Sequence, residues 1–273
     1  MEKIRKNQTM CEASKNIFGS FRDPSGFIFF RDNTVYRQIN LIYKDDYDCL
    51  LGSGLYRALV DAGLLIPHIE ANVPPEDAAV AYKVIKPEAI PFVSYPYEWC
   101  FSQLKRAALT TLAVQKKALE FGMALKDASA YNIQFIGCRP LLIDTLSFEK
   151  YREGQAWIAY RQFCQHFLAP LALMSCVDIR LNQLTRSYID GIPLDLASSM
   201  LPFRTYLRFS LLSHIHCHYW FQKFHENRPP KQYVPGLNRL GFFALIDNLK
   251  SAIEGLKWKP RKSNWSGYYA DTN

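Results

Sequence analysis

The chain has no closely spaced pair of cysteines, although it contains seven cysteines in 273 residues. No CxxC motif occurs, and the odd number of scattered thiols does not suit a set of structural disulfides. This pattern predicts free thiols in a reducing compartment, and it argues against a zinc site built from paired cysteines. We therefore expect a cytoplasmic protein.

Long hydrophobic runs are also missing. The longest, FLAPLALMSCV, is too short to cross a bilayer as a helix and contains a proline. The first residues, MEKIRKNQTMCEASKN, lack the apolar core of a signal peptide. The sequence thus predicts a soluble protein with no membrane partner.

Acidic residues are fewer than basic ones, and the formal net charge is +8. The stretch from Lys223 to Lys262 holds nine Lys or Arg against three Asp or Glu. Such a stretch could meet nucleic acid or an acidic partner. No recognition helix, zinc finger or RNP-like aromatic motif accompanies it, so a solvated basic surface is the favoured interpretation and nucleic acid is not an expected partner.

What the sequence has in its first third is strand-forming residues between turns. FIFF and TVYRQI, separated by RDNT and preceded by DPSG, predict two antiparallel strands joined by a short turn, with a shorter strand possible before DPSG. KDDYDCLLGSGLYRALVDAGLLIPH predicts a helix or helix pair that ends at Gly63 and Pro67. Its GSG does not follow a strand, which makes it a weak phosphate-loop candidate. AVAYKVIKP and IPFVSYPYEW predict two further strands.

Helical patterns dominate the remainder. CFSQLKRAALTTLAVQKKALEFG predicts a long amphipathic helix that stops near Gly122. Short apolar strands follow around PLLIDTLSF, and after residue 157 the patterns are mostly helical. The order predicts an α+β fold, with a small strand-rich part before a larger helical part.

One motif carries possible chemistry. ALKDASAYNIQF places Asp127 five residues before Asn132, and the next apolar strand brings Asp144. Asp and Asn are common in turns, so a polar turn between strands is one interpretation. The other is phosphoryl transfer, in which one carboxylate orients a hydroxyl and two further oxygen ligands hold magnesium.

The element order and this spacing resemble the protein-kinase-like fold, with aminoglycoside phosphotransferases as a close comparison. The resemblance implies two lobes, with Asp127 as the catalytic residue and Asn132 and Asp144 as metal ligands. It places VSYPYEW, with Tyr95 and Tyr97, at the hinge that faces adenine. The cofactor contacts that it implies are Arg37, Tyr95, Tyr97 and Lys126.

Several residues depart from the kinase pattern. Leu125 stands where the loop usually opens with histidine, and Asp144 is followed by Thr145 and Leu146 instead of Phe-Gly. No GxGxxG loop occurs, and GSFRDPSG is the nearest substitute. Arg37 stands at the position of the phosphate-binding lysine, and its forked guanidinium is not equivalent to a lysine ammonium group. The alternative interpretation is that Arg37 is a surface residue of a strand. These departures leave a pseudokinase open.

A narrower resemblance covers nearly the whole chain. Runs such as FRDPSGFIFFRDNTVYRQIN, KDASAYNIQF and YIDGIPLDLAS look like the N-terminal half of bacterial proteins in which a class I S-adenosylmethionine-dependent methyltransferase domain follows. Together the two resemblances imply an N-lobe over 1–96, a helical C-lobe over 97–258 with its catalytic-loop-like segment at 124–148, and a linker or tail over 259–273 toward an absent methyltransferase domain. S-adenosylmethionine would then bind only in the absent C-terminal domain.

Two functions follow as hypotheses. The first is an ATP- and magnesium-dependent phosphotransferase acting on a hydroxyl of a small molecule or sugar. The second is a pseudokinase-like module that binds substrate for, or regulates, a fused or associated methyltransferase. HIHCHYW, with His214 and His218 four residues apart, could hold zinc, but it lacks a third ligand and reads better as buried core histidines.

Overall fold

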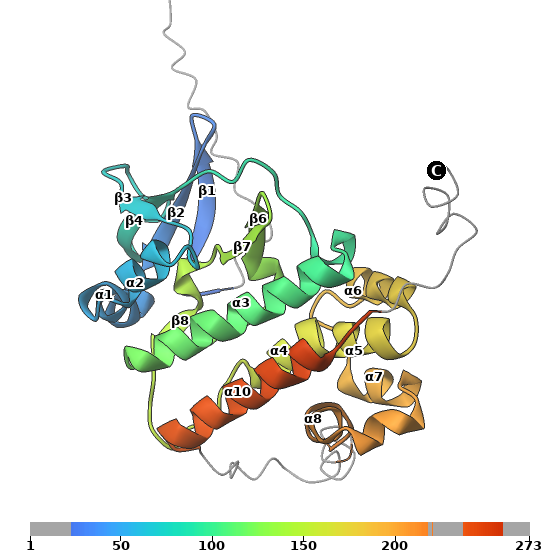
Figure 1. The fold of residues 1–273 in the computed structure, drawn as a ribbon. Helices are drawn as coiled ribbons and strands as arrows, with labels where there is room; N and C mark the ends of the chain where they lie inside the picture. Colours follow the sequence, from blue (N-terminus) through green and yellow to red (C-terminus); the bar gives the residue numbers. More distant parts are fainter. Residues whose placement is uncertain (1–22, 218–219, 221–236, 259–273) are drawn as a thin grey trace, which may run out of the picture. The chain divides into compact units, whose positions relative to one another are not determined.

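A computed structural model describes residues 23–217, 220 and 237–258. It contains both helices and strands, in agreement with the predicted α+β class (Figure 1). The chain divides into two compact units. Unit 1 comprises the residues up to Asp48 together with Pro67–Ala89, and unit 2 comprises Cys49–Ile66 together with the residues from Ile90 onward.

Unit 1 is built on a four-stranded sheet in the order β1-β2-β4-β3, with antiparallel neighbours throughout. The strands are β1 (Gly26–Arg31), β2 (Thr34–Asn40), β3 (His68–Glu70) and β4 (Ala81–Pro87). Phe27, Phe29 and Val84 form its small apolar core. The predicted hairpin is confirmed, and the possible shorter strand before DPSG falls outside the described residues.

The turn between β1 and β2 sets the register in which these two strands pair. Asp32 and Asn33 connect β1 and β2 with φ angles of 48° and 57°, so both adopt the left-handed conformation. Two such residues suit the tight turn whose twist matches that of the flanking strands. Arg31 then pairs with Thr34, and the register continues to Gly26 opposite Ile39.

The predicted helix pair is also present, as α1 (Lys44–Gly52) and α2 (Leu55–Asp61). Gly54, with φ of 84°, is the N-cap residue of α2. GSG therefore joins two helices and does not follow a strand. This arrangement is not that of a phosphate loop.

Unit 2 is organised around the long helix α3 (Phe101–Glu120), which forms as predicted and is followed by Gly122 with φ of 75°. Its buried face belongs to one large apolar core. Two antiparallel strand pairs follow it in sequence, β5 (Met123–Leu125) with β8 (Phe148–Lys150), and β6 (Ile133–Ile136) with β7 (Arg139–Leu142).

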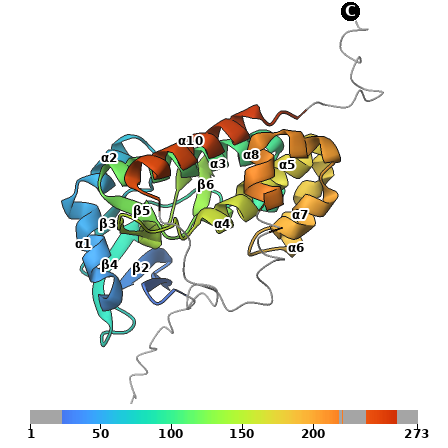
Figure 2. The same ribbon diagram turned by 90° about the horizontal axis from the view of Figure 1, so that it is seen from below.

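Further helices of unit 2 lie among its described residues. Their bounds are α4 (Tyr160–Phe163), α5 (Ala169–Cys176), α6 (Leu184–Ser187), α7 (Leu194–Met200), α8 (Phe209–Leu211) and α10 (Arg239–Gly255). Two π-helical segments, Cys164–Leu168 and Leu212–His216, adjoin α4, α5 and α8. Helix α10 lies alongside α3 (Figure 2), where Lys105 of α3 donates to the carbonyls of Glu254 and Leu256 at 2.8 Å each.

The predicted strand IPFVSYPYEW is wrong. Residues 90–99 contain only a short 3₁₀ turn, Pro96–Glu98, and no strand. Pro91 and Pro96 lack the N–H that a strand ladder requires, and β4 already has β2 and β3 on its two edges. Within the described ranges, no helix has the length and apolar character needed to cross a membrane.

Candidate functional site

The segment that carries Asp127, Asn132 and Asp144 is held by the two strand pairs of unit 2. The β5–β8 pair holds its two ends, because Leu125 lies opposite Phe148. The β6–β7 hairpin occupies its middle. Two buried groups fix the strand end at Leu125: its N–H donates to Gln115 Oε1 at 2.6 Å, and its carbonyl accepts from Trp157 Nε1 at 2.8 Å. The loop therefore begins at a rigid point.

Asp127 stands at the start of a compact turn. Its Oδ1 accepts the N–H of Ser129 at 2.9 Å, and Ser129 Oγ in turn accepts the N–H of Tyr131 at 3.2 Å. The N–H of Ala128 donates to Gln162 Oε1 of α4 at 2.7 Å. Asp127 is thus partly buried in a turn that α4 holds in place from outside the motif.

Asn132 and the turn after Asp144 are tied together through Ser147. Asn132 Nδ2 donates to Ser147 Oγ at 3.3 Å, and the N–H of Ile143 donates to the carbonyl of Asn132 at 2.8 Å. The N–H of Lys126 donates to the carbonyl of Ser147 at 2.8 Å. The structure therefore brings Lys126, Asn132 and the turn of Asp144 to one place.

Asp144 caps the short 3₁₀ turn Thr145–Ser147. Its Oδ1 accepts the N–H of Leu146 at 2.8 Å, as expected of an aspartate at an N-cap position. The cap fixes the orientation of the carboxylate relative to the backbone. Asp144 is half-buried, and so is Asn132.

The donor set suits a hard cation. Asn132 donates its amide N–H to Ser147 Oγ, and its Oδ1 and the carboxylate of Asp144 are the oxygen atoms that this region could offer to a metal. Among the described residues, no group of three or more His, Cys, Asp or Glu could hold a metal ion. Two protein oxygens completed by phosphate and water are what Mg²⁺ accepts, so the residues present fit that ion.

The segment predicted as a hinge is held by side chains of unit 2. Gln134 of β6 accepts the N–H of Ser94 at 3.0 Å and donates to its carbonyl at 2.9 Å. Asn182 donates to the carbonyls of Pro96 and Trp99 at 3.2 and 3.0 Å. Backbone groups of this segment therefore bond to side chains of unit 2, where a strand would have bonded to a neighbouring strand.

Backbone groups of the hinge segment are already engaged. The N–H of Tyr95 donates to Glu98 Oε2 at 2.7 Å, and the carbonyl of Tyr97 accepts from Gln183 at 3.1 Å. The two tyrosine rings stack with centroids 5.4 Å apart and an interplanar angle of 8°. What this segment offers a ligand is therefore mainly the face of an aromatic pair.

These tyrosines lie next to the predicted catalytic loop. The ring of Tyr95 is 6.5 Å from that of Tyr131, and Tyr131 meets the ring of His166 edge-on at 6.2 Å. Burial raises the pKa of Tyr131, with smaller contributions from Tyr97 and Asp190. Burial lowers the pKa of His166 to about 4, against the opposing effect of Asp190. His166 is therefore neutral at physiological pH.

Arg37 lies in unit 1, on β2, where it pairs with Ile28 of β1 and Ile85 of β4. It is half-buried on a central strand. Its predicted contact with the phosphates of a nucleotide stays a prediction, and so does the lobe division of 1–96 and 97–258.

The histidine cluster is core, as predicted for the residues that are described. His214 bonds Tyr160 at Nδ1 and Asn248 at Nε2, at 2.6 and 2.7 Å. His216 bonds Ser198 and Thr205 at 2.8 and 3.0 Å. Both rings use both nitrogens, which leaves none for zinc. His218 lies outside the described residues.

Sequence reasoning missed Gln162 and Ser147, which position the loop, and Gln134, which holds the segment predicted as a hinge. Each acts through a single hydrogen bond or a pair of them to a residue 15 to 40 positions away. Glutamine and serine are common in such places without special spacing. No local signal could have identified them.

Comparison with known proteins adds one relative. No protein-family model matches the chain. The Nodulation protein NoeA of Rhizobium meliloti (strain 1021) is 34% identical over 266 residues, which is 93% of this chain. The chain spans about half the length of this curated relative, 55%. The relative's name places that protein in nodulation and specifies no reaction.

Proposed function

We propose that this chain is a kinase-like, two-lobed protein that binds ATP with magnesium and transfers phosphate to a hydroxyl of a small molecule or sugar. The observation that carries the proposal is the tie between Asn132 and the turn of Asp144 through Ser147. It ties Asn132 to the 3₁₀ turn that Asp144 caps, and these two residues are the metal ligands that the proposal requires.

Phosphoryl transfer asks little covalent chemistry of a protein and depends on positioning and charge neutralisation. Asp127 would orient the acceptor hydroxyl and accept its proton. Its turn is fixed by Ser129 and by Gln162, so the carboxylate is held without a bound substrate. Such pre-organisation is what a positioning role requires.

Asn132 Oδ1 and the carboxylate of Asp144 would hold the metal. Magnesium bound there would neutralise charge on the phosphate oxygens. The cap between Asp144 and Leu146 fixes one carboxylate oxygen to the backbone. The stacked pair Tyr95 and Tyr97 would contact the adenine ring, and Lys126 would supply positive charge for the phosphates.

A methyltransferase domain, fused or associated, is the proposed partner. The matched region covers only about half of the NoeA relative, and a longer protein has room for a second domain. S-adenosylmethionine would belong to that domain.

The second candidate is a pseudokinase-like module that binds substrate for the methyltransferase or regulates it. It is favoured by Leu125, which stands where the loop of kinases usually opens with histidine. The side chain of Leu125 is buried and apolar, so it cannot take part in catalysis, and its N–H and carbonyl are both hydrogen-bonded within the protein.

Calorimetric titration with ATP and magnesium tests the proposal. Wild-type protein should bind saturably and only with magnesium, and Asp144→Asn should lose at least about tenfold in affinity because a charged ligand is removed. Asparagine also caps helical turns, so this variant should keep its fold. Asp195→Asn, an exposed position on α7, is the matched control and should bind like wild type.

Phosphate transfer to a panel of hydroxyl compounds then separates the two candidates. An Asp127→Asn variant that binds ATP normally but has lost transfer would support the enzyme. Binding without transfer in the wild type would favour the pseudokinase. Absence of ATP binding in folded wild-type protein would refute the phosphotransferase and leave a substrate-binding or regulatory module that does not use ATP.

A further inference from the structure

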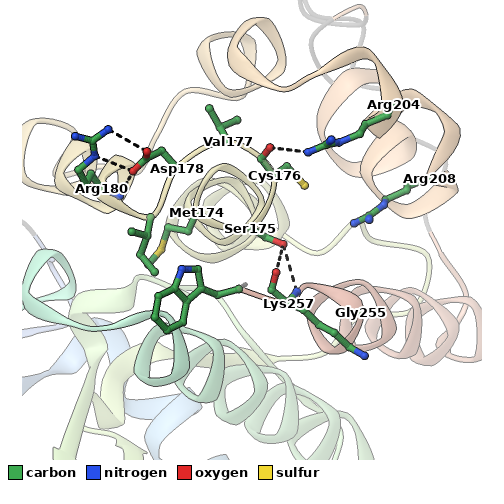
Figure 3. Close-up of a pocket in the computed structure, with 12 residues that line it drawn as sticks. Met174, Ser175, Cys176, Val177, Asp178, Arg180, Arg204, Arg208, Gly255 and Lys257 are labelled. Atoms are coloured by element: carbon green, nitrogen blue, oxygen red, sulfur yellow. Dashed lines mark hydrogen bonds and ion pairs between the residues drawn. The ribbon is translucent and has the colours of Figure 1, made fainter. Parts of the chain in front are cut away.

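A separate cavity of unit 2 lies at the end of α5, and its volume is about 870 Å³ (Figure 3). It is formed by three stretches of chain: the end of α5 with the following 3₁₀ turn, the segment before α8, and the end of α10. None of its lining residues belongs to the segment 124–148. The lining residues are Met174, Ser175, Cys176, Val177, Asp178, Ile179, Arg180, Arg204, Arg208, Gly255, Lys257 and Trp258.

The lining carries an excess of positive charge. One cation, Arg180, is neutralised by Asp178, which it contacts through Nε at 2.9 Å and Nη2 at 3.0 Å. Arg204 and Arg208 have no carboxylate partner among the described residues. In Figure 3 both extend from the same segment toward the end of α5.

The two arginines differ in how they are held. Arg204 Nη2 donates to the carbonyl of Cys176 at 3.0 Å, which anchors the guanidinium at the cavity and leaves its other N–H groups available. The side chain of Arg208 makes no hydrogen bond or ion pair with another described residue. The cavity is thus lined by one anchored and one uncommitted guanidinium, and guanidinium groups bind anions such as phosphate.

The base of the cavity is pre-formed. Ser175 Oγ donates to the carbonyl of Lys257 at 2.8 Å and accepts its N–H at 3.3 Å, joining α5 to the end of α10. Apolar side chains complete the walls, among them Met174, Ile179 and the half-exposed Trp258. A cavity of this volume lies within the range of sites for small molecules, which combine apolar walls with a few convergent polar groups.

We propose that this cavity binds a small phosphate monoester with an apolar or aromatic body. Arg204 and Arg208 contact the phosphate, because a guanidinium can donate two parallel hydrogen bonds to it. Trp258 and the neighbouring apolar side chains contact the body of the ligand. The site is independent of the proposed nucleotide site and does not need it to be correct.

Calorimetric titration of the full chain with phenyl phosphate, inorganic phosphate and phenol tests the proposal. Phenyl phosphate should bind saturably and about threefold or more tightly than inorganic phosphate, because the ring adds contacts with the walls. Phenol should bind much more weakly than either. Arg208→Gln and Arg204→Gln should each raise the Kd for phenyl phosphate by about tenfold.

Matched variants keep the test specific. Both arginines are exposed, so their replacement should leave the melting temperature near that of the wild type. Arg57→Gln, an exposed arginine of α2, should bind phenyl phosphate like the wild type. Trp258→Ala should weaken phenyl phosphate but leave inorganic phosphate unchanged.

The proposal would be overturned if phenyl phosphate showed no saturable binding, if Arg208→Gln bound it as tightly as the wild type, or if phenol bound as tightly as phenyl phosphate. Tight binding of a single-stranded oligonucleotide without binding of either phosphate would also overturn it, and would assign the cations to nucleic acid. The variant Asp144→Asn, which tests the proposed function, should bind phenyl phosphate like the wild type. The phenyl phosphate site can therefore be tested separately from the proposed nucleotide site.

Discussion

Replacing Gly191 with alanine should strongly destabilise unit 2. Gly191 has φ of +96°, and a Cβ at this position would lie 2.6 Å from Cβ of Gln165 and 3.0 Å from its backbone carbonyl carbon. The ring of His166 would be 3.1 Å away. The clash with backbone cannot be relieved by a side-chain rotation, so the helix segment and the loop would have to separate.

The magnitude follows from two contributions. A left-handed backbone costs a residue with a Cβ about 1–2 kcal/mol. Overpacking against a fixed neighbour costs about 1–3 kcal/mol more. The sum of about 2–5 kcal/mol should lower the melting temperature by about 5–15 °C in a unit of this size.

Thermal and urea denaturation followed by circular dichroism would measure this effect, with two matched controls. Gly137 has φ of +59° but no atom within 4 Å of the added Cβ, so Gly137→Ala should show only the backbone contribution. Gly52→Ala at the end of α1 has neither cost and should be neutral or slightly stabilising. If Gly191→Ala destabilised no more than Gly137→Ala, the inferred close packing of the loop on Gln165 would be refuted.

Two further predictions concern the surroundings of the candidate site. Because the pKa of His166 is about 4 when folded and near 6.5 when unfolded, the unfolded chain binds more protons between these values. The free energy of unfolding should therefore fall by up to about 3 kcal/mol as pH drops from about 6.5 to 4. Measured by urea denaturation at a series of pH values, the His166→Gln variant should lose less stability over this range than the wild type. The same pH dependence in both proteins would contradict the lowered pKa of His166. Trp157→Phe removes the buried hydrogen bond to the carbonyl of Leu125, and should cost about 1–2 kcal/mol in urea denaturation; no loss would show that the carbonyl finds another donor.

The elements that the sequence predicts well are those specified by local chemistry. Asp32 and Asn33 tolerate positive φ, and together with the β-branched and aromatic residues around them they define the first hairpin. The apolar spacing of Phe101–Glu120 and the glycine at 122 define the long helix in the same way. Each signal lies within a few residues of the structure that it determines.

The stretch 90–99 shows where such reasoning fails. Aromatic and β-branched residues gave it the appearance of a strand, yet its conformation is set by Gln134 and Asn182, which lie far along the sequence. The helical run after residue 157 contains a π-helical turn at Cys164–Leu168 for which the apolar pattern gave no sign. In the stretch 90–99 the deciding contacts are tertiary.

The candidate site likewise contains residues that the sequence predicts and residues that it does not. The spacing of Asp127, Asn132 and Asp144 was visible in the sequence as a motif. The serine that joins two of them, Ser147, was not, because its role arises only when β8 pairs with β5. The candidate residues could thus be predicted from their spacing in the sequence, but the hydrogen bonds that position them could not.

The path of the chain through the two units has a practical consequence for dissecting the protein. The backbone at residues 64–66 pairs with Leu142, in a short parallel bridge, so Cys49–Ile66 belongs with unit 2 although unit 1 residues flank it on both sides. No single cleavage of the polypeptide can release unit 1 intact. Limited proteolysis would have to cut near both residues 48 and 66, as well as near residue 89, and a gene for unit 1 alone would have to join Asp48 to Pro67 through an engineered connection.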